Sequence, residues 1–252
     1  PVPSSLRRAR PMHLVRSEHN PGRGDRERGS CEMRADLHIH SLHSGDCGLT
    51  VDEILRRSRG LGLGAIAIMD HNSFRGAVEA LSLDGEGVVV LPGMEITTSS
   101  GHVLAYNISE EVKKGLNVEE TIDMIHGVGG IAVAPHPFRI WSGLGSACIQ
   151  RAKFDAVEAI NGRSLGSSNR RASRLAESLG LPVTAGSDAH LLEHVGKAQA
   201  VFPDGAYTAE DIVTSILRRE VKVEGSSRSV AESLRYGSKC ISEWARRGFR
   251  RT

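Results

Sequence analysis

With 252 residues, 39% of them hydrophobic, the chain is long enough to bury a sizeable core, and we expect a single α/β domain. Its formal net charge of +2 excludes a strong overall field for polyanions. No apolar run reaches the roughly 18 residues of a membrane helix, so no membrane partner is expected. The four cysteines form no CxxC pair, which argues against a disulfide scaffold and favours a reducing, cytoplasmic location.

Residues 1–33 differ from the rest of the chain. They contain seven arginines, show no apolar periodicity and lack the regions of a signal peptide. We predict a disordered basic extension, followed by a folded domain that begins near Met33. A mis-assigned start or an unstructured extension explains this segment more simply than a functional basic arm does.

The first predicted strand, 35–41, carries Asp36, His38 and His40 at every second position. Alternate side chains of a strand share one face, so both imidazoles point the same way from Cα atoms about 7 Å apart. Two histidines so placed can bind one metal ion. A pair of hydrogen-bonded core histidines is the alternative explanation.

The polar loop after this strand contains Asp46 and leads into a predicted helix over 49–62. Thr50 and Glu53 are three residues apart at its start, which is the pattern of a capping box. A short buried strand over 65–72 follows and ends in an Asp-His pair.

The rest of the chain continues to alternate between strands and helices. Helices are predicted over 73–83, 118–130 and 167–180, and strands over 88–96, 101–108, 131–137, 154–161 and 181–190. This alternation indicates βα units and a mostly parallel sheet, which is either closed or doubly wound. About seven strands favour a closed barrel in one α/β domain.

Polar residues lie at or just beyond the C-terminal end of nearly every apolar strand, the edge at which βα barrels build active sites. Six of the eleven histidines and three acidic residues occupy such positions: His38, His40, His71, His102, His136, His190, Asp46, Glu95 and Asp188. Neutral imidazoles and carboxylates are ligands for zinc, manganese or iron, and burying so many without a cation would be costly. A multinuclear metal site explains all nine, although each histidine taken singly is more often structural.

The motifs DLHIHS, MDHN, GMEI, GHVL, APHP and GSDAH occur in this order between residues 34 and 203. Together they resemble the successive motifs of the PHP (polymerase and histidinol phosphatase) superfamily. The resemblance implies a distorted seven-stranded (β/α)7 TIM-like barrel with up to three divalent metal ions at its C-terminal rim. It also implies phosphoesterase activity, or a role as a proofreading or accessory module of a bacterial DNA polymerase.

The resemblance further implies which residues hold each ion. The first ion would be bound by His38, His40, Glu95 and Asp188, the second by Glu95, His102 and His136, and the third by Asp46, His71 and His190. Glu95 would bridge the first two ions. Asp46 stands where some relatives carry histidine, which favours manganese or iron over zinc at the third position.

The expected chemistry follows from the charges. Two ions about 3.5 to 4 Å apart lower the pKa of a shared water to near neutrality and clamp the oxygens of an in-line displacement at phosphorus. A hydroxide that bridges the metals is the expected nucleophile, and Asp188 or His190 is the candidate to pass a proton to the leaving group. Asp36 and Asp70 could accept the second N–H of a ligand histidine, with a turn or strand-end cap as the alternative.

Arg139, Arg163 and Asn161 are the candidate substrate-binding residues, because they follow rim strands where a guanidinium can bind phosphate bidentately. A solvated loop position is the alternative for each arginine, and a simple turn start is the alternative for Asn161. His43 and Cys47 flank the third-ion position and are either auxiliary ligands or, as we favour, ordinary loop residues.

Residues 226–252 are predicted to form a basic amphipathic helix beyond a barrel that spans 34–225. Its apolar side chains at helical spacing are Val230, Leu234, Ile241 and Trp244. Packing against the barrel is favoured over a nucleic-acid contact, because aromatic platforms for bases are scarce in this chain.

The favoured function is metal-dependent hydrolysis of a small phosphomonoester, such as a nucleotide or a nucleoside bisphosphate. The first alternative is a nucleic-acid-processing exonuclease or a polymerase-associated module, and the second is a histidinol phosphatase. The complete ligand set disfavours a non-catalytic metal-binding module. The identity of the ester, the metals and the oligomeric state are left open by the sequence.

Overall fold

The computed structural model describes residues 32–83, 87–205 and 208–228. The strands of these ranges form two five-stranded sheets, with the orders β10-β9-β1-β2-β3 and β4-β5-β6-β7-β8. Most of the predicted N-terminal extension and of the predicted C-terminal helix lies outside the described residues.

The first sheet combines strands from both ends of the described chain. Its strands are β1 (Met33–Ile39), β2 (Ala65–Ile68), β3 (Val89–Val90), β9 (Ala198–Phe202) and β10 (Lys222–Gly225). The first three are parallel, whereas β9 is antiparallel to both β1 and β10. Its helices are α1 (Val51–Gly60), α2 (Arg75–Ser82) and α6 (Ala209–Leu217).

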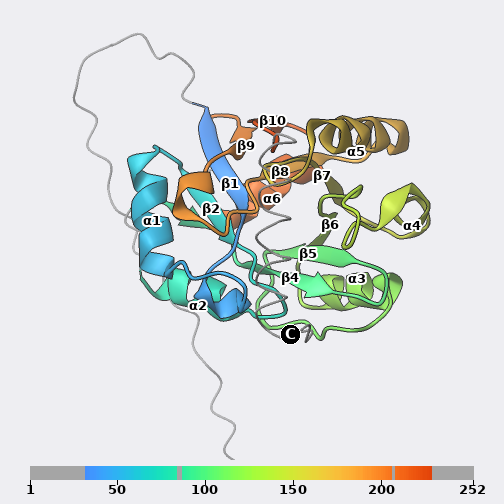
Figure 1. Cartoon of the computed structure of the whole chain (residues 1–252), viewed down its shortest axis with the longest axis horizontal. Coiled ribbons are helices and arrows are strands. Elements are labelled where there is room, and N and C mark those ends of the chain that lie inside the picture. Colours follow the sequence, from blue (N-terminus) through green and yellow to red (C-terminus); the bar gives the residue numbers. More distant parts are fainter. Residues whose placement is uncertain (1–31, 84–86, 206–207, 229–252) are drawn as a thin grey trace, which may run out of the picture.

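The second sheet is half antiparallel and half parallel. Its strands are β4 (Gly93–Thr97), β5 (His102–Tyr106), β6 (Ile131–Ala134), β7 (Ala156–Asn161) and β8 (Val183–Gly186). The first three are joined antiparallel and the last three parallel. Figure 1 shows this sheet with its helices α3 (Val118–Gly127), α4 (Gly145–Arg151) and α5 (Gly166–Leu179) on the side away from α1 and α2.

A closed seven-stranded barrel is not confirmed. The predicted strand 88–96 is divided into β3 and β4, which belong to different sheets. Pro92 lies at this division, and proline has no N–H to donate to a strand ladder. The antiparallel strands β5, β9 and β10 also interrupt the expected βα alternation. The described chain therefore has a mixed α/β fold.

The two sheets meet where candidate ligands lie. The N–H of Asp188, just after β8, donates to the carbonyl of His38 in β1 at 2.6 Å. The N–H of Glu95 in β4 donates to the carbonyl of Asp70, just after β2, at 3.2 Å. Backbone bonds between the sheets thus set the relative positions of side chains that come from both.

The capping box predicted for the first helix is confirmed. The N–H of Glu53 donates to the hydroxyl of Thr50 at 3.3 Å, and the N–H of Thr50 donates to the Glu53 carboxylate at 2.9 Å. The other three predicted helices correspond to α2, α3 and α5. The helices α4 and α6 and the strands β9 and β10 were not predicted.

Apolar side chains from both sheets share one core cluster, which includes Leu37, Leu104, Tyr106 and Phe202. The fully buried Tyr106 satisfies its hydroxyl by donating to the carbonyl of Leu37 at 3.0 Å. This bond ties β5 of the second sheet to β1 of the first. Within the described ranges, no helix has both the length and the apolar character needed to cross a membrane.

Candidate metal centre

The nine candidate ligands converge on the place where the two sheets meet. They come from β1 and the loop after it, from the ends of β2, β6 and β8, and from β4 and β5: His38, His40, Asp46, His71, Glu95, His102, His136, Asp188 and His190. Three groups among them hold donor atoms within 4.8 Å of one another. The groups contain eight of the nine residues, and the ninth, His136, joins them through its contact with Glu95 at 2.9 Å.

Glu95 lies at the centre of the cluster and is 1% exposed. Its Oε1 atom is 2.8 Å from Nδ1 of His102 and 2.9 Å from Nε2 of His136. Its Oε2 atom is 3.3 Å from Nε2 of both His38 and His40. One carboxylate therefore faces imidazoles on both of its oxygens, as a bridging ligand would.

The outer part of the cluster is formed by Asp46, His71 and His190, with His40 shared between both parts. Oδ2 of Asp46 is 3.0 Å from Nε2 of His190 and 3.7 Å from Nε2 of His71. The Nδ1 atom of His71 is buried 3.2 Å from a Glu95 oxygen but makes no hydrogen bond. Buried polar atoms in folded proteins are normally paired, so an imidazole nitrogen without a hydrogen-bond partner is open to coordinate a metal ion.

The central carboxylates are held in the ionised state. Burial opposes ionisation of Glu95, but the imidazoles around it, that of His38 among them, hold its pKa well below the usual range. Burial likewise opposes ionisation of Asp188, but the guanidinium groups of Arg139 and Arg163 hold its pKa well below the usual range. Both side chains are therefore charged acceptors near neutral pH.

The cluster also favours added positive charge. Burial lowers the pKa of His38, but the neighbouring carboxylates, Glu158 and Asp188 foremost, outweigh it and raise that pKa well above the usual value. Burial lowers the pKa of His71 to about 4, which leaves this imidazole neutral and able to coordinate. Carboxylates and imidazole nitrogens are the donor set of divalent metals, and a bound cation would take the place of the proton that the carboxylates favour on His38, so these residues fit such ions.

Two of the candidate ligands have an unusual backbone conformation. His136 and Asp188 have φ angles of 28° and 54°. Positive φ costs of order 1 to 3 kcal/mol at a non-glycine residue and persists where surrounding contacts impose it. At His136 the constraint comes from its N–H, which donates to the carboxylate of Glu158 at 2.8 Å. This geometry aims both side chains into the cluster.

Glu158 supports the cluster from behind. Its Oε1 atom lies 2.8 Å from Nδ1 of the fully buried His38, and its Oε2 atom accepts the side-chain N–H of Asn161 at 2.9 Å. A carboxylate on the second nitrogen of a ligand histidine fixes the tautomer and orients the ring. No sequence pattern indicated this contact, because it joins residues 120 positions apart.

Asp36 and Asp70, for which the sequence left this supporting role and a capping role open, bind backbone N–H groups, and Asp70 also binds a hydroxyl. Asp36 accepts the N–H groups of Ser187 and Gly196, each at 2.8 Å, and burial raises its pKa to about 6. Asp70 accepts both the N–H and the hydroxyl of Ser41 at 2.6 Å. Each carboxylate joins chain segments at a strand end, which is the capping role that was the alternative.

The three candidate substrate-binding residues lie against the same ligand carboxylate. Arg139 Nη2 donates to Asp188 Oδ2 at 2.5 Å, and Arg163 Nη1 donates to Asp188 Oδ1 at 3.1 Å. Asn161 Nδ2 also donates to Asp188 Oδ2, at 3.1 Å, and its Oδ1 accepts from Arg139 at 2.8 Å. Asn161 is fully buried, whereas both arginine side chains keep a part of their surface exposed at the edge of the cluster.

The loop after β1 holds the outer part in place. Ser44 Oγ lies 3.1 Å from His40 Nδ1, a contact that no sequence pattern indicated. Cys47 donates its S–H to the carbonyl of His40 at 3.2 Å. His43 points toward α2, where its Nε2 lies 2.6 Å from Oε2 of Glu79. His43 and Cys47 therefore act here as loop residues.

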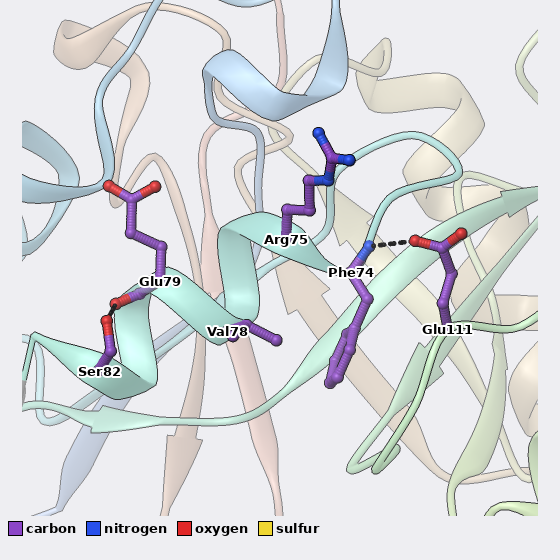
Figure 2. A pocket seen from close by; sticks show the side chains of 6 residues that line it. All are labelled: Phe74, Arg75, Val78, Glu79, Ser82 and Glu111. Carbon is purple, nitrogen blue, oxygen red and sulfur yellow. Dashed lines mark hydrogen bonds between the residues drawn. The ribbon is translucent and has the colours of Figure 1, made fainter.

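A hollow of about 450 Å³ lies over α2, beside the loop that precedes α3 (Figure 2). Its lining residues are Phe74, Arg75, Val78, Glu79, Ser82 and Glu111. The nine candidate ligands do not line this hollow. Glu79 of the hollow contacts His43, which lies in the loop that carries Asp46, and we assign the chemistry to the cluster and not to the hollow.

The fold and this cluster define an α/β protein with a candidate metal centre between two sheets. Residues 36–140 match the family model of the PHP domain, and residues 166–221 match the PHP-associated model. MJ1587, an uncharacterised protein of Methanocaldococcus jannaschii, is 39% identical over 141 residues, which cover 51% of this chain and 82% of that protein. The chain belongs to the PHP superfamily.

Solved structures share the fold. A two-domain protein from Bacteroides vulgatus, which contains a predicted PHP-like metal-dependent phosphoesterase, has a TM-score of 0.67 and 16% identity over 84% of this chain and 70% of its own. The lesion-specific endonuclease PfuEndoQ from Pyrococcus furiosus has a TM-score of 0.56 and 19% identity over 76% of this chain and 57% of its own. The chain thus has the PHP-like phosphoesterase fold with His/Asp clusters that could hold metal ions.

Proposed function

We propose that the protein is a metal-dependent phosphoesterase that hydrolyses a small phosphomonoester, such as a nucleotide or a nucleoside bisphosphate. The observation that carries the proposal is the position of Glu95, a buried carboxylate with five imidazole nitrogens within 3.3 Å of its oxygens. This arrangement suits a ligand shared between two divalent ions.

The proposed assignment of ligands follows the three groups expected from the resemblance, with zinc, manganese or iron as the ions. Divalent ions held there would neutralise charge on phosphate oxygens and lower the pKa of a bound water. The roles of Glu95, Asp188 and His190 in catalysis and of Arg139 and Arg163 in substrate binding are part of this proposal.

The chain's own residues contribute binding and orientation. The guanidinium groups of Arg139 and Arg163 lie at the partly exposed edge of the cluster, where each can donate to a phosphate oxygen. Asn161 holds Arg139 in place through its side-chain oxygen. His190, 11% exposed in its side chain, lies at the same edge, and we assign to it the transfer of a proton to the leaving group.

The test is release of inorganic phosphate from a panel of phosphomonoesters, histidinol phosphate included, by protein loaded with manganese. Asp188→Ala removes a central ligand, and Asp123→Ala removes an exposed carboxylate of α3 as the matched control. We expect release from at least one ester, lost in the first variant and kept in the second. Full activity of Asp188→Ala would refute the proposed site.

A nuclease is the second candidate, because the fold is similar to that of a lesion-specific endonuclease over three quarters of this chain. Short oligonucleotides belong in the same panel. Cleavage of oligonucleotides without release from any monoester would favour this candidate. Binding to single strands should then weaken steeply as salt is raised, since phosphate contacts release counterions.

A further inference from the structure

The loop after β6 carries two unusually exposed apolar side chains. Ile140 is 87% exposed and Trp141 is 95% exposed, whereas the other exposed large apolar side chains among the described residues reach at most 51%. Single exposed apolar residues are common on proteins and need no explanation. Two adjacent apolar side chains with such high exposed fractions, one of them a tryptophan, indicate a surface that binds a ligand or another molecule.

The chain on either side of Trp141 contacts residues of the candidate metal centre. Two residues before it, the side chain of Arg139 donates to Asp188 at 2.5 Å. One residue after it, the carbonyl of Ser142 accepts the backbone N–H of His102 at 3.1 Å. Two residues span at most about 7 Å, so the backbone of Trp141 lies within that distance of two residues that contact the cluster.

The backbone of this loop is held in a compact turn. The N–H groups of Arg139 and Gly143 donate to the carbonyls of His136 and Arg139, each at 3.0 Å, and that of Gly145 donates to Pro137 at 2.9 Å. A Cβ on Gly143 would lie 2.6 Å from the carbonyl oxygens of both Pro137 and Arg139, so only glycine fits. The exposure of the tip is therefore a property of a fixed turn.

We propose that Trp141, with Ile140 beside it, is a stacking platform for a planar aromatic ring in the leaving group of the phosphate ester, as in a nucleotide. This inference rests on the proposed function. The guanidinium groups at the cluster edge bind the phosphate of the ester. The indole of Trp141, two residues along the chain from Arg139, offers a flat apolar face to the ring. The polar edges of a base stacked there stay in contact with water, because the tip is open to solvent.

The test compares adenosine 5′-monophosphate with ribose 5-phosphate, which lacks the ring. In Trp141→Ala we expect the ratio of their kcat/KM values to fall about 5- to 150-fold, through a higher KM for the nucleotide, as loss of base stacking does. Trp141→Phe should restore most of the ratio. Leu217→Ala, which removes an exposed apolar side chain at the end of α6, is the matched control and should leave the ratio unchanged.

A binding measurement supplies an independent readout. The chain contains two tryptophans, so in a Trp244→Phe variant Trp141 is the sole indole fluorophore. Adenosine 5′-monophosphate should quench its emission, and ribose 5-phosphate should not. Equal quenching by both compounds would contradict stacking.

The outcomes separate this inference from the proposed function. Hydrolysis that persists with an unchanged ratio in Trp141→Ala overturns the platform and leaves the phosphoesterase intact. Absence of hydrolysis on every ester overturns both. An unchanged ratio together with a lower oligomeric state of Trp141→Ala in light scattering assigns the pair to a contact between copies of the chain, and overturns the platform as well.

Discussion

The inner and outer parts of the candidate metal centre use the same kinds of donor in different surroundings. The inner donors His38, His40, Glu95 and Asp188 are at most 1% exposed. The outer carboxylate, Asp46, has a side chain that is 50% exposed. The difference follows from what supports each part, since the inner donors lie in or beside strands where the sheets meet and Asp46 lies in a loop.

This difference has an electrostatic consequence. A charge in a buried site interacts more strongly with its partners than a charge that water screens. Removal of an inner donor leaves the charges of its buried neighbours without a partner, whereas water can replace the exposed carboxylate of Asp46. We therefore expect the inner part to bind ions tightly and the outer part to exchange them more readily.

The largest effect is expected from Glu95→Gln, which removes the charge that faces five imidazoles. Activity should fall by roughly 10³-fold, as when a central electrostatic group of an active site is lost. Metal content, measured by mass spectrometry on the purified protein, should fall with it. Glu79→Gln, which changes a partly exposed glutamate of α2, should keep both. Retention of normal metal content by Glu95→Gln would contradict its place as the shared ligand.

The next effect is expected from Glu158→Gln, which weakens the support behind His38. Loss of such a partner typically costs 10- to 100-fold in metal affinity. Titration with a competing chelator measures this change directly. The control is Glu177→Gln, an exposed position of α5. An unchanged affinity would show that packing alone orients the imidazole of His38.

A smaller effect is expected from Asp46→Asn, because the outer carboxylate is half exposed and water can take its place. We expect a loss of about 10-fold in metal affinity confined to one ion, the one that a chelator removes first. Stoichiometry at each step of a chelator titration tests this order. Simultaneous loss of all ions would break the distinction between the inner and outer parts.

The smallest effect is expected away from the centre, at the start of α1. Thr50→Ala removes one half of the capping box and should lower stability by about 1 kcal/mol, measured by urea unfolding. Thr208→Ala, which removes the equivalent group from the capping box of α6, should have a similar effect. Both variants should keep their metal content and activity. A loss of metal from either one would mean that the helix starts contribute directly to the centre.

Local patterns predicted much of what surrounds the centre. The capping box placed α1, apolar periodicity placed α2, α3 and α5, and the positions of polar residues at strand ends selected nine donors that the structure does gather. These features depend on neighbours within a few residues, for which side-chain direction follows from the regular geometry of a helix or strand. Cytoplasmic location and the absence of a membrane partner stay predictions.

The arrangement of the sheets could not be obtained in the same way. A break of two residues between β3 and β4 sends the chain from one sheet to the other, and β9 returns from the far end of the described chain to pair with β1. Such pairings join residues that are distant in sequence, so no short pattern carries them. The expected barrel assumed that successive strands are neighbours, which holds for many pairs in such folds and fails at β3 and β4.

The sequence by itself therefore determined which side chains could bind metal and on which strand ends they lie. Tertiary structure alone decided their partners: Glu158 behind His38, backbone N–H groups for Asp36, and two arginines on Asp188. The reason is that alternation within a strand sets the direction of a side chain relative to its own backbone. What that side chain meets depends on which distant strand packs opposite, and this is decided only when both sheets form.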